Sequence, residues 1–449
     1  MALLGMGFAE KFIKSLSGSG GVDISIRPLI VAMGVLVFIF FLFSPGQTSN
    51  NLAILLFTAP LWIPFVLIYF AWSAWVDTRR AEYLLDQKYV LLELRLPRDT
   101  KKTPLAMETI FSNLNIGSGE SNWYKKYWRG SVRPWWSVEI ASIGGQVRFF
   151  VWTREGLRRG LESYFYAQYP GIEVIEAMDY SRLVDPSASD QGMFAAEFAL
   201  TNPDPYPIKT YIDYGLDKPG TKPEEQIDPL AQVIELLGSL GPKEQLWLQI
   251  IFRMTKKEKY GDRDWKDEAH EEIAKIQKKT VRKGTSFDPT TGAKRETEGF
   301  PNPTKGQSDT INAIEKNIAK PGFDVGIRLI YSAPKEHYAG ATVPHALTMM
   351  KVFSSNSYNG FKPAGRYDTK FGDYPWEDRR GTRKQREHER ALEFYRRRAY
   401  FYDPYVGPWM VLSSEELATI YHVPSSTVQT PSLPRIQSAT SSAPSNLPT

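Results

Sequence analysis

Residues 136–178 read WSVEIASIGGQVRFFVWTREGLRRGLESYFYAQYPGIEVIEAM and carry the clearest structural pattern in the chain. Two runs rich in β-branched and aromatic residues, 136–143 and 146–153, have the composition of strands. They flank the dipeptide Gly144-Gly145, and two consecutive glycines favour the tight turn of a β-hairpin. We therefore predict two antiparallel strands joined by a two-residue loop.

The hairpin is the centre of a longer pattern. A helix is expected over residues 154–169, because apolar side chains recur there at helical spacing and Pro170 follows. A strand is expected over 172–178. Upstream, the sequence predicts a strand over 89–96 and a helix over 104–116. The order β-α-β-β-α-β predicts an α+β fold whose first half, residues 84–182, is ferredoxin-like.

The second half, residues 190–423, is expected to repeat that order and to carry a charged insertion at 255–322. The insertion is expected to be a solvated hairpin of two helices joined by a loose Gly/Thr/Pro stretch. A Pro/Ser/Thr-rich tail at 424–449 is expected to be disordered or linker-like. The elements expected in this half are strands over 194–201, 207–213, 245–254, 325–333 and 409–413, and helices over 229–238 and 345–353.

Composition limits the chemistry that the chain can perform. The 449 residues include 55 Lys+Arg, 50 Asp+Glu and no Cys, with a net charge of +5. The lack of cysteine removes disulfides, thiolate metal sites and thiol nucleophiles. The segment most like a phosphate-binding loop, residues 215–222 (GLDKPGTK), transposes the final Lys-Thr pair and contains a proline. We expect no cofactor, no metal site and no catalytic group.

The N-terminal region is strongly apolar. Residues 28–43 (PLIVAMGVLVFIFFLF) and 52–76 (LAILLFTAPLWIPFVLIYFAWSAWV) contain no charge, and the second run is long enough to cross a bilayer. A signal peptide or a buried core hairpin would be the alternatives. We predict a transmembrane hairpin over 28–76 that follows a cytoplasmic segment, 1–27. Positive charges on both flanks predict that both termini and the soluble region are cytoplasmic.

Two basic stretches are candidates for contact with phosphates. Residues 126–136 interleave arginines with aromatic residues, which suits base stacking or a membrane face, although aromatic residues more often pack in a core. Residues 379–398 predict an exposed basic helix, which is either a solvated surface or a site for phosphate or anionic lipid. The candidate nucleic-acid-binding residues are Arg129, Arg133, Trp135, Trp136, Arg379, Arg380, Arg383 and Arg386.

Several ordered motifs resemble the membrane-proximal region of conjugative-transfer coupling ATPases. These belong to the HerA-like family of type IV secretion, in the form found in small-genome uncultivated bacteria. The motifs are VLLELRLPRDTKKTPLAMETIF (90–111), EIASIGGQVRFFVWT (139–153), ESYFYAQYPGIEVIEAMDY (162–180), PIKTY (207–211) and EELATIYHVPSSTVQTPSLPR (415–435).

The resemblance implies a place in a larger machine. In that family this region precedes the motor domain, whereas the present sequence ends at Thr449, where relatives would begin their ATPase. The protein would then be a non-enzymatic component of the bacterial inner membrane that docks a separate HerA-like ATPase or another secretion subunit, as an oligomer. A membrane-anchored nucleic-acid-binding module is the alternative. The residues expected at the junction with the motor are Leu417, Tyr421, His422 and Pro424.

Overall fold

The computed structural model describes residues 48–436, except 99, 101, 186–190, 218–226, 258–263, 288–293, 365–381, 403, 427 and 429. The described residues form two compact units. Unit 1 draws on Met1–Asp86, Ser118–Val132 and Lys257–Asp264, and unit 2 contains the rest. The predicted segment 1–27 and the first predicted apolar span, 28–43, lie outside the described residues.

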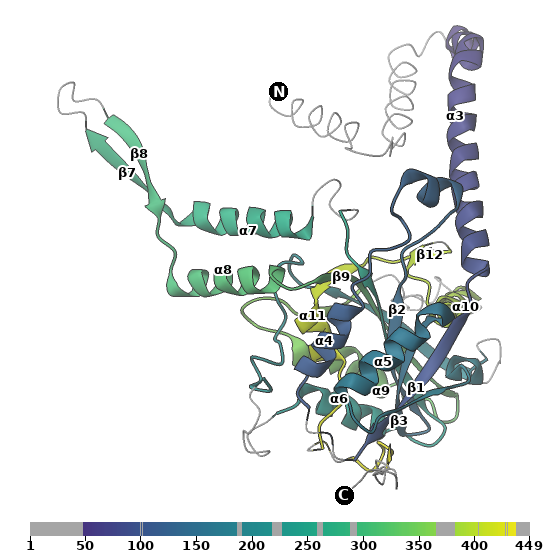
Figure 1. Cartoon of the computed structure of the whole chain (residues 1–449). Coiled ribbons are helices and arrows are strands. Elements are labelled where there is room, and N and C mark those ends of the chain that lie inside the picture. The colour runs from purple at the N-terminus through teal and green to yellow at the C-terminus, as the bar shows by residue number, and fades with distance from the viewer. Residues whose placement is uncertain are drawn as a thin grey trace, which may run out of the picture. The chain divides into compact units, whose positions relative to one another are not determined.

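Unit 2 is an α+β domain built on one large sheet (Figure 1). Its first half has the predicted order of strands and helices. Four strands lie side by side in the order β4-β1-β3-β2, and all three pairings are antiparallel. The elements are β1 (Tyr89–Pro97), α4 (Leu105–Asn113), β2 (Trp136–Ile143), β3 (Gln146–Arg154), α5 (Arg158–Gln168) and β4 (Glu173–Glu176).

The second half has the same strand order, β10-β5-β9-β6, again with antiparallel pairings only. The two halves join where β2 pairs with β6, with Glu139 opposite Gln249. From either edge of the sheet towards this central pair, the strands therefore follow in the same order: fourth, first, third and second strand of their half. The elements are β5 (Gln191–Leu200), α6 (Pro229–Gly238), β6 (Gln245–Met254), β9 (Gly322–Pro334), α9 (Thr342–Thr348), the 3-10 helix η6 (Met349–Phe353) and β10 (Phe361–Ala364).

Two strand predictions in this half were wrong. Residues 207–210 have no regular secondary structure and 211–213 form a turn, in which the Asp213 carboxylate accepts from the Thr210 backbone N–H. The fourth strand is β10 rather than residues 409–413. Those residues form β13 (Met410–Ser413), which pairs with the N-terminal end of β9, beyond the point where the β5 pairing stops.

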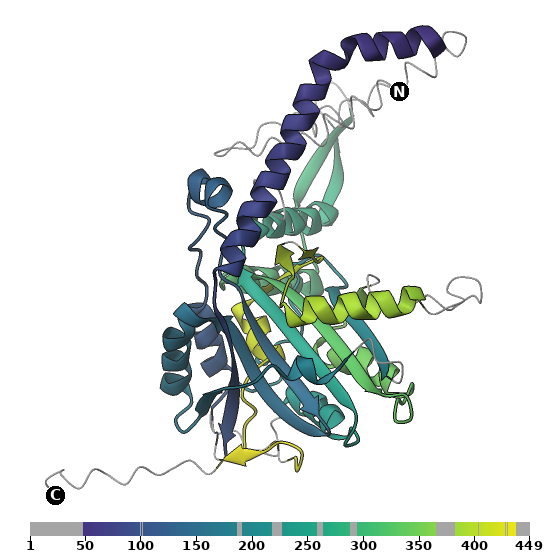
Figure 2. The ribbon, with the colours of Figure 1, turned by 90° about the vertical axis from the view of Figure 1, so that its right-hand side faces the viewer.

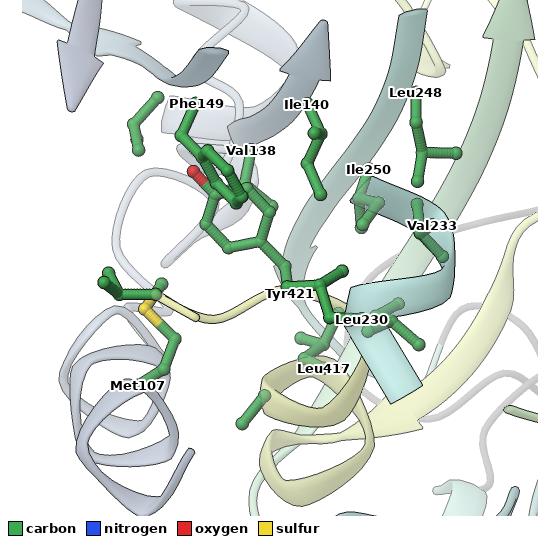
Figure 3. Packing of buried hydrophobic residues seen from close by; sticks show 14 of the residues in the cluster. Met107, Val138, Ile140, Phe149, Leu230, Val233, Leu248, Ile250, Leu417 and Tyr421 are labelled. Carbon is green, nitrogen blue, oxygen red and sulfur yellow. The ribbon is translucent and has the colours of Figure 1, made fainter. Parts of the chain in front are cut away.

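Helices cover one face of the sheet and create the main apolar core. α4, α5, α6, α9 and α11 (Ser414–Ile420) place their buried side chains against alternate residues of the central strands. Figure 3 shows Val138, Ile140 and Leu248 from the sheet facing Leu417 and Tyr421. The period-2 alternation of the strands explains why every second residue enters this core.

On the opposite face the helix α10 (Thr382–Arg396) and the segment that follows it lie over the sheet (Figure 2), and buried polar side chains lie beneath them. That segment includes the short strands β11 (Phe401–Tyr402) and β12 (Tyr405–Val406). A Cβ atom at Gly326 or Gly407 would lie 2.4 or 2.5 Å from the Tyr400 ring, so a side chain at either position would force this ring to move. The buried ion pairs of this layer include Arg398–Glu139, Arg328–Glu197 and Arg253–Asp324, with N–O distances of 3.0, 3.1 and 3.0 Å.

The insertion and the tail both differ from expectation. Residues 255–322 contain the two expected helices, α7 (Trp265–Thr280) and α8 (Lys305–Ile318), but the segment between them forms a β-hairpin rather than a loose loop. Its strands are β7 (Val281–Phe287) and β8 (Lys294–Pro301). The described part of the tail packs on the sheet, since Val428 and Leu433 are buried and β14 (Arg435–Ile436) pairs with β1. Residues 437–449 lie outside the described part.

Unit 1 consists chiefly of the 38-residue helix α3 (Thr48–Leu85) and the π-helix η2 (Tyr124–Trp128). The second predicted apolar span therefore lies on one helix, which contains Pro60 and Pro64. Among the described residues, no helix is both long enough and apolar enough to cross a membrane.

Candidate functional site

The most distinctive surface of unit 1 surrounds η2, within the sequence WYKKYWRG at residues 123–130. The π-helix is closed by a hydrogen bond from the Arg129 N–H to the Tyr124 carbonyl, 3.0 Å long. The Asn122 side chain caps its start by accepting from the Lys125 N–H. Trp123, Tyr124 and Trp128 remain exposed, with 62%, 44% and 49% of their surface accessible. This short turn thus presents three large rings to solvent.

Aromatic contacts fix η2 to the C-terminal part of α3. The ring centroids of Trp72 and Tyr127 lie 6.0 Å apart, and those of Trp75 and Trp128 lie 5.4 Å apart. Gly130 follows with φ +63°, and a Cβ atom there would lie 2.2 Å from a backbone oxygen of α3. Only glycine permits this close approach of the two backbone segments. We call residues 123–129, together with Trp72 and Trp75, the cuff.

Cations are interleaved with the rings of the cuff. Lys125 and Arg129 are exposed, and Lys126 is half-buried. The Arg129 guanidinium lies 5.7 Å from the centroid of the Tyr124 ring, and the Lys126 ammonium lies 5.1 Å from that of Tyr127. Such contacts hold a cation beside an aromatic face at little cost in solvation. The cuff therefore combines flat apolar surfaces with positive charge.

The part of α3 that precedes the cuff exposes apolar side chains instead of polar ones. No charged residue occurs between Arg27 and Asp77. A soluble helix usually presents a polar face to water, and contiguous exposed apolar surface is typical of a contact site for a protein or a membrane. The exposed large apolar residues of α3 before the cuff are Phe57, Ile63, Leu67, Ile68 and Phe70.

The structure separates the predicted nucleic-acid residues of the first basic stretch. Arg129 belongs to the cuff of unit 1. Arg133, Trp135 and Trp136 lie in unit 2 and are buried, so they offer little surface to a nucleic acid, and their role in binding one stays a prediction. Trp136 begins β2 and packs against Phe252, while Arg133 donates to the Met254 carbonyl. These side chains pack in the interior of unit 2. Sequence composition alone does not distinguish aromatic and basic residues that pack there from those that bind a nucleic acid.

The second basic stretch forms α10, as predicted. Arg383 and Arg386 are exposed on its N-terminal half. Arg379 and Arg380 lie outside the described residues. The C-terminal end of α10 turns inward, where Tyr395 is fully buried and its hydroxyl bonds to that of Tyr180. The C-terminal end of α10 thus packs against the rest of unit 2, and its N-terminal half exposes basic side chains.

The residues predicted to dock a motor lie in the interior of unit 2. Leu417, Tyr421, His422 and Pro424 are all buried, so they offer little surface to a partner, and their role in docking stays a prediction. The first two pack in the core, and the Tyr421 hydroxyl donates to a carbonyl of β3. Every residue of α11 except Glu415 is buried, so the rest of the fold encloses this helix.

Two buried titratable groups lie in and beside α11. Burial alone would lower the pKa of His422, but the Asp228 carboxylate, 3.2 Å from its Nε2, raises that pKa. Burial raises the pKa of Glu416 to about 7, although the backbone N–H groups of Ser413 and Ile208 donate to its carboxylate and oppose the rise. These groups are part of the fold, and both take a proton more readily there than in water.

Among the described residues no cluster of His, Asp and Glu could hold a metal ion. Trp128 belongs to the stretch 126–136 singled out from the sequence, whereas Trp123, Tyr124 and Lys125 of the cuff lie before that stretch. The alternation of rings and cations in WYKKYW was visible in the sequence, but only the structure joins it to the end of α3.

Comparison with known proteins places this architecture in a family. A model described as a domain of unknown function, DUF8128, matches residues 85–435. The chain belongs to the DUF8128 family. No curated protein matches it. The DUF8128 match covers nearly all of unit 2 and includes the η2 segment, whereas α3 precedes it. The family description assigns no activity.

Proposed function

We propose that this DUF8128 protein is a non-enzymatic scaffold held to the inner membrane of a bacterium through unit 1. The observation that carries the proposal is the exposed apolar surface of α3, which ends in the cuff. Tryptophan and tyrosine favour the boundary between hydrocarbon and water, and basic side chains favour the headgroups beyond it. In unit 1 the exposed apolar side chains of α3 come first, and the aromatic rings and basic side chains follow.

Fractionation of cells that express the full chain tests this proposal. We expect the protein in the membrane pellet after washes with urea and alkaline carbonate, and in solution only after detergent. Replacing Leu67 and Ile68 of α3 by Glu should release it, because the exposed apolar surface would carry two charges. The matched variant replaces Leu105 and Ile212, which are exposed in unit 2, by Glu and should stay in the pellet. Recovery of the unaltered chain in the soluble fraction would refute the proposal.

The partner implied by the sequence resemblance is a separate HerA-like ATPase or another secretion subunit. The buried junction residues give no surface for it, so docking would have to use other parts of unit 2. Co-purification of the detergent-extracted protein with products of neighbouring genes tests this. If the protein is repeatedly recovered without an ATPase or secretion subunit, the proposed partner would be refuted. The proposal of a membrane scaffold would still stand. Light scattering of the same sample would test whether the chain is an oligomer.

We also infer that unit 2 consists of two ferredoxin-like halves. Each half runs β-α-β-β-α-β along the chain, and in each half the fourth strand lies beside the first and the third beside the second. The insertion with α7 and α8 lies at the point of the second half where the first half has its Gly144-Gly145 turn. A scaffold with two similar halves would offer two similar helical faces to its partners.

A nucleic-acid-binding module is the second candidate, favoured by the charge distribution on α10. Its first turn contains no acidic residue and exposes Arg383 and Lys384, although cations are unfavourable at a helix N-terminus. A phosphate backbone would offset that cost. Binding to DNA should then fall steeply with salt and vanish when Arg379, Arg380, Arg383 and Arg386 are reversed to Glu. Unchanged binding in that variant would exclude this function.

A further inference from the structure

Lys125 and Arg129 of the cuff differ from two exposed arginines of α10 in their partners. Arg390 and Arg397 of α10 form ion pairs with glutamates of the same helix, at 3.1 and 2.6 Å. No described acidic side chain forms an ion pair with Lys125 or Arg129. The segment 118–132 contains three cations and one acidic residue, Glu120. The positive charges of Lys125 and Arg129 are therefore available to an external anion.

The rings around these cations indicate which kind of anion fits. Trp123 and Trp128 lie on either side of Lys125 and Lys126 in the sequence, and both rings are exposed. Large rings of this kind partition into the headgroup region of a bilayer, which would place the ammonium groups at the depth of the lipid phosphates. A free phosphate in water would gain nothing from the rings.

We propose that the cuff is a binding surface for anionic phospholipid headgroups, with Lys125 and Arg129 as the selecting charges. This inference rests on the proposed membrane association and adds a lipid class to it. The rings hold the turn at the interface, and the cations distinguish a lipid of net negative charge from a zwitterionic one. Contact with Trp75 and the close approach at Gly130 keep the turn in a fixed position on α3.

The size of the selectivity follows from the number of charges. A cation near an anionic bilayer surface contributes about 1 kcal/mol, which is roughly a fivefold preference. Lys125 and Arg129 together should therefore favour anionic over zwitterionic lipid by about 25-fold, and exchange of both for Gln should remove most of this preference. High salt should weaken it, because exposed charges are screened within about 10 Å at 0.1 M.

The test uses the full chain in vesicles in which either phosphatidylglycerol or phosphatidylcholine carries brominated acyl chains that quench tryptophan fluorescence. We expect the wild-type protein to be quenched preferentially by the brominated phosphatidylglycerol. The Lys125→Gln/Arg129→Gln variant should lose the preference. The control, Arg383→Gln/Arg386→Gln, removes two exposed cations of α10 and should keep it.

Three other results would overturn the inference. Equal quenching by both lipids in the wild-type protein would show a membrane contact without lipid selection. A preference retained in Lys125→Gln/Arg129→Gln would assign selection to other residues. If that variant lost binding to single-stranded DNA and kept its lipid preference, the cuff would be a nucleic-acid surface. Absence of quenching by either lipid would instead refute membrane association itself, and with it the proposed function.

Discussion

Replacement of Arg398 by Met should destabilise unit 2 more than any loss of surface charge. The Arg398 guanidinium is 1% exposed and donates from Nε and Nη2 to the two carboxylate oxygens of Glu139, at 3.0 and 3.1 Å. It also donates to Asp179. Met fills a similar volume without charge, so the change removes the cation and leaves Glu139 at 0% exposure.

The expected cost follows from what remains around Glu139. Its oxygens would still accept from Ser137, Tyr180 and Gln249, but those neutral donors do not compensate a buried negative charge. Breaking a buried ion pair on one side typically costs about 3–5 kcal/mol. Glu139→Gln should cost less, about 1–3 kcal/mol, because Arg398 keeps Asp179 as a partner.

The double variant Arg398→Met/Glu139→Gln separates the pair from its surroundings. We expect it to be more stable than the sum of the single changes predicts, by about 0.5–3 kcal/mol, since neither charge is then left alone. The control is Arg397→Met, in which an exposed pair with Glu393 is lost and at most about 1 kcal/mol is expected.

Urea titration of the full-length protein, followed by tryptophan fluorescence, measures these differences. Trp247 lies within this layer and contacts Tyr180 and Tyr395, so its emission reports on the region directly. An unfolding free energy of Arg398→Met within about 1 kcal/mol of the wild type would refute the reasoning, because it would match a surface pair. Strict additivity in the double variant would also refute it.

Further predictions concern packing and pH. Gly326→Ala should destabilise the fold by about 1–3 kcal/mol, because its Cβ would lie 2.4 Å from the Tyr400 ring, and a lowered melting temperature would show this. Gly160→Ala should instead stabilise the fold by about 0.5–1 kcal/mol and so raise the melting temperature, since nothing lies within 4 Å of a Cβ on this helical residue. Stability should fall as pH rises from about 5 to 7, by up to about 1.4 kcal/mol per pH unit, because folded Glu416 retains its proton up to a pKa of about 7. The raised pKa of His422 adds a loss of the same sign above its usual range. Urea midpoints at several pH values would measure the slope, and Glu416→Gln should flatten it between pH 5 and 7; an unchanged slope in that variant would contradict the assignment.

Local patterns in the sequence predicted most elements of the fold. The Gly144-Gly145 turn has φ values of +60° and +81°, as a tight hairpin requires, and the strands on either side pair as expected. Long-range pairing was harder to predict. β10 (FKPA) is short and contains Pro363, so it lacks a strand signal, and only its position beside β5 makes it the fourth strand of its half.

The candidate site was predicted less well because burial depends on tertiary contacts. The aromatic and basic composition of residues 126–136 was recognised, yet unit 1 holds the part around Arg129 and unit 2 buries the part from Arg133 onward. Likewise the tail was expected to be loose, but Leu433 enters the core and Arg435 donates to five backbone carbonyls. No pattern in a Pro/Ser/Thr-rich sequence predicts such contacts.

Membrane association of unit 1 is the central claim, and the chain offers a direct test because it contains no cysteine. Leu67→Cys on α3 and Leu105→Cys on α4 replace side chains of similar exposure, 61% and 50%. Broken cell membranes would be treated with a membrane-impermeant maleimide, and labelling would be repeated after denaturation in detergent. We expect Leu105→Cys to be labelled in both conditions and Leu67→Cys only after denaturation. Equal labelling of the two positions in untreated membranes would show that α3 is in water and would contradict the account.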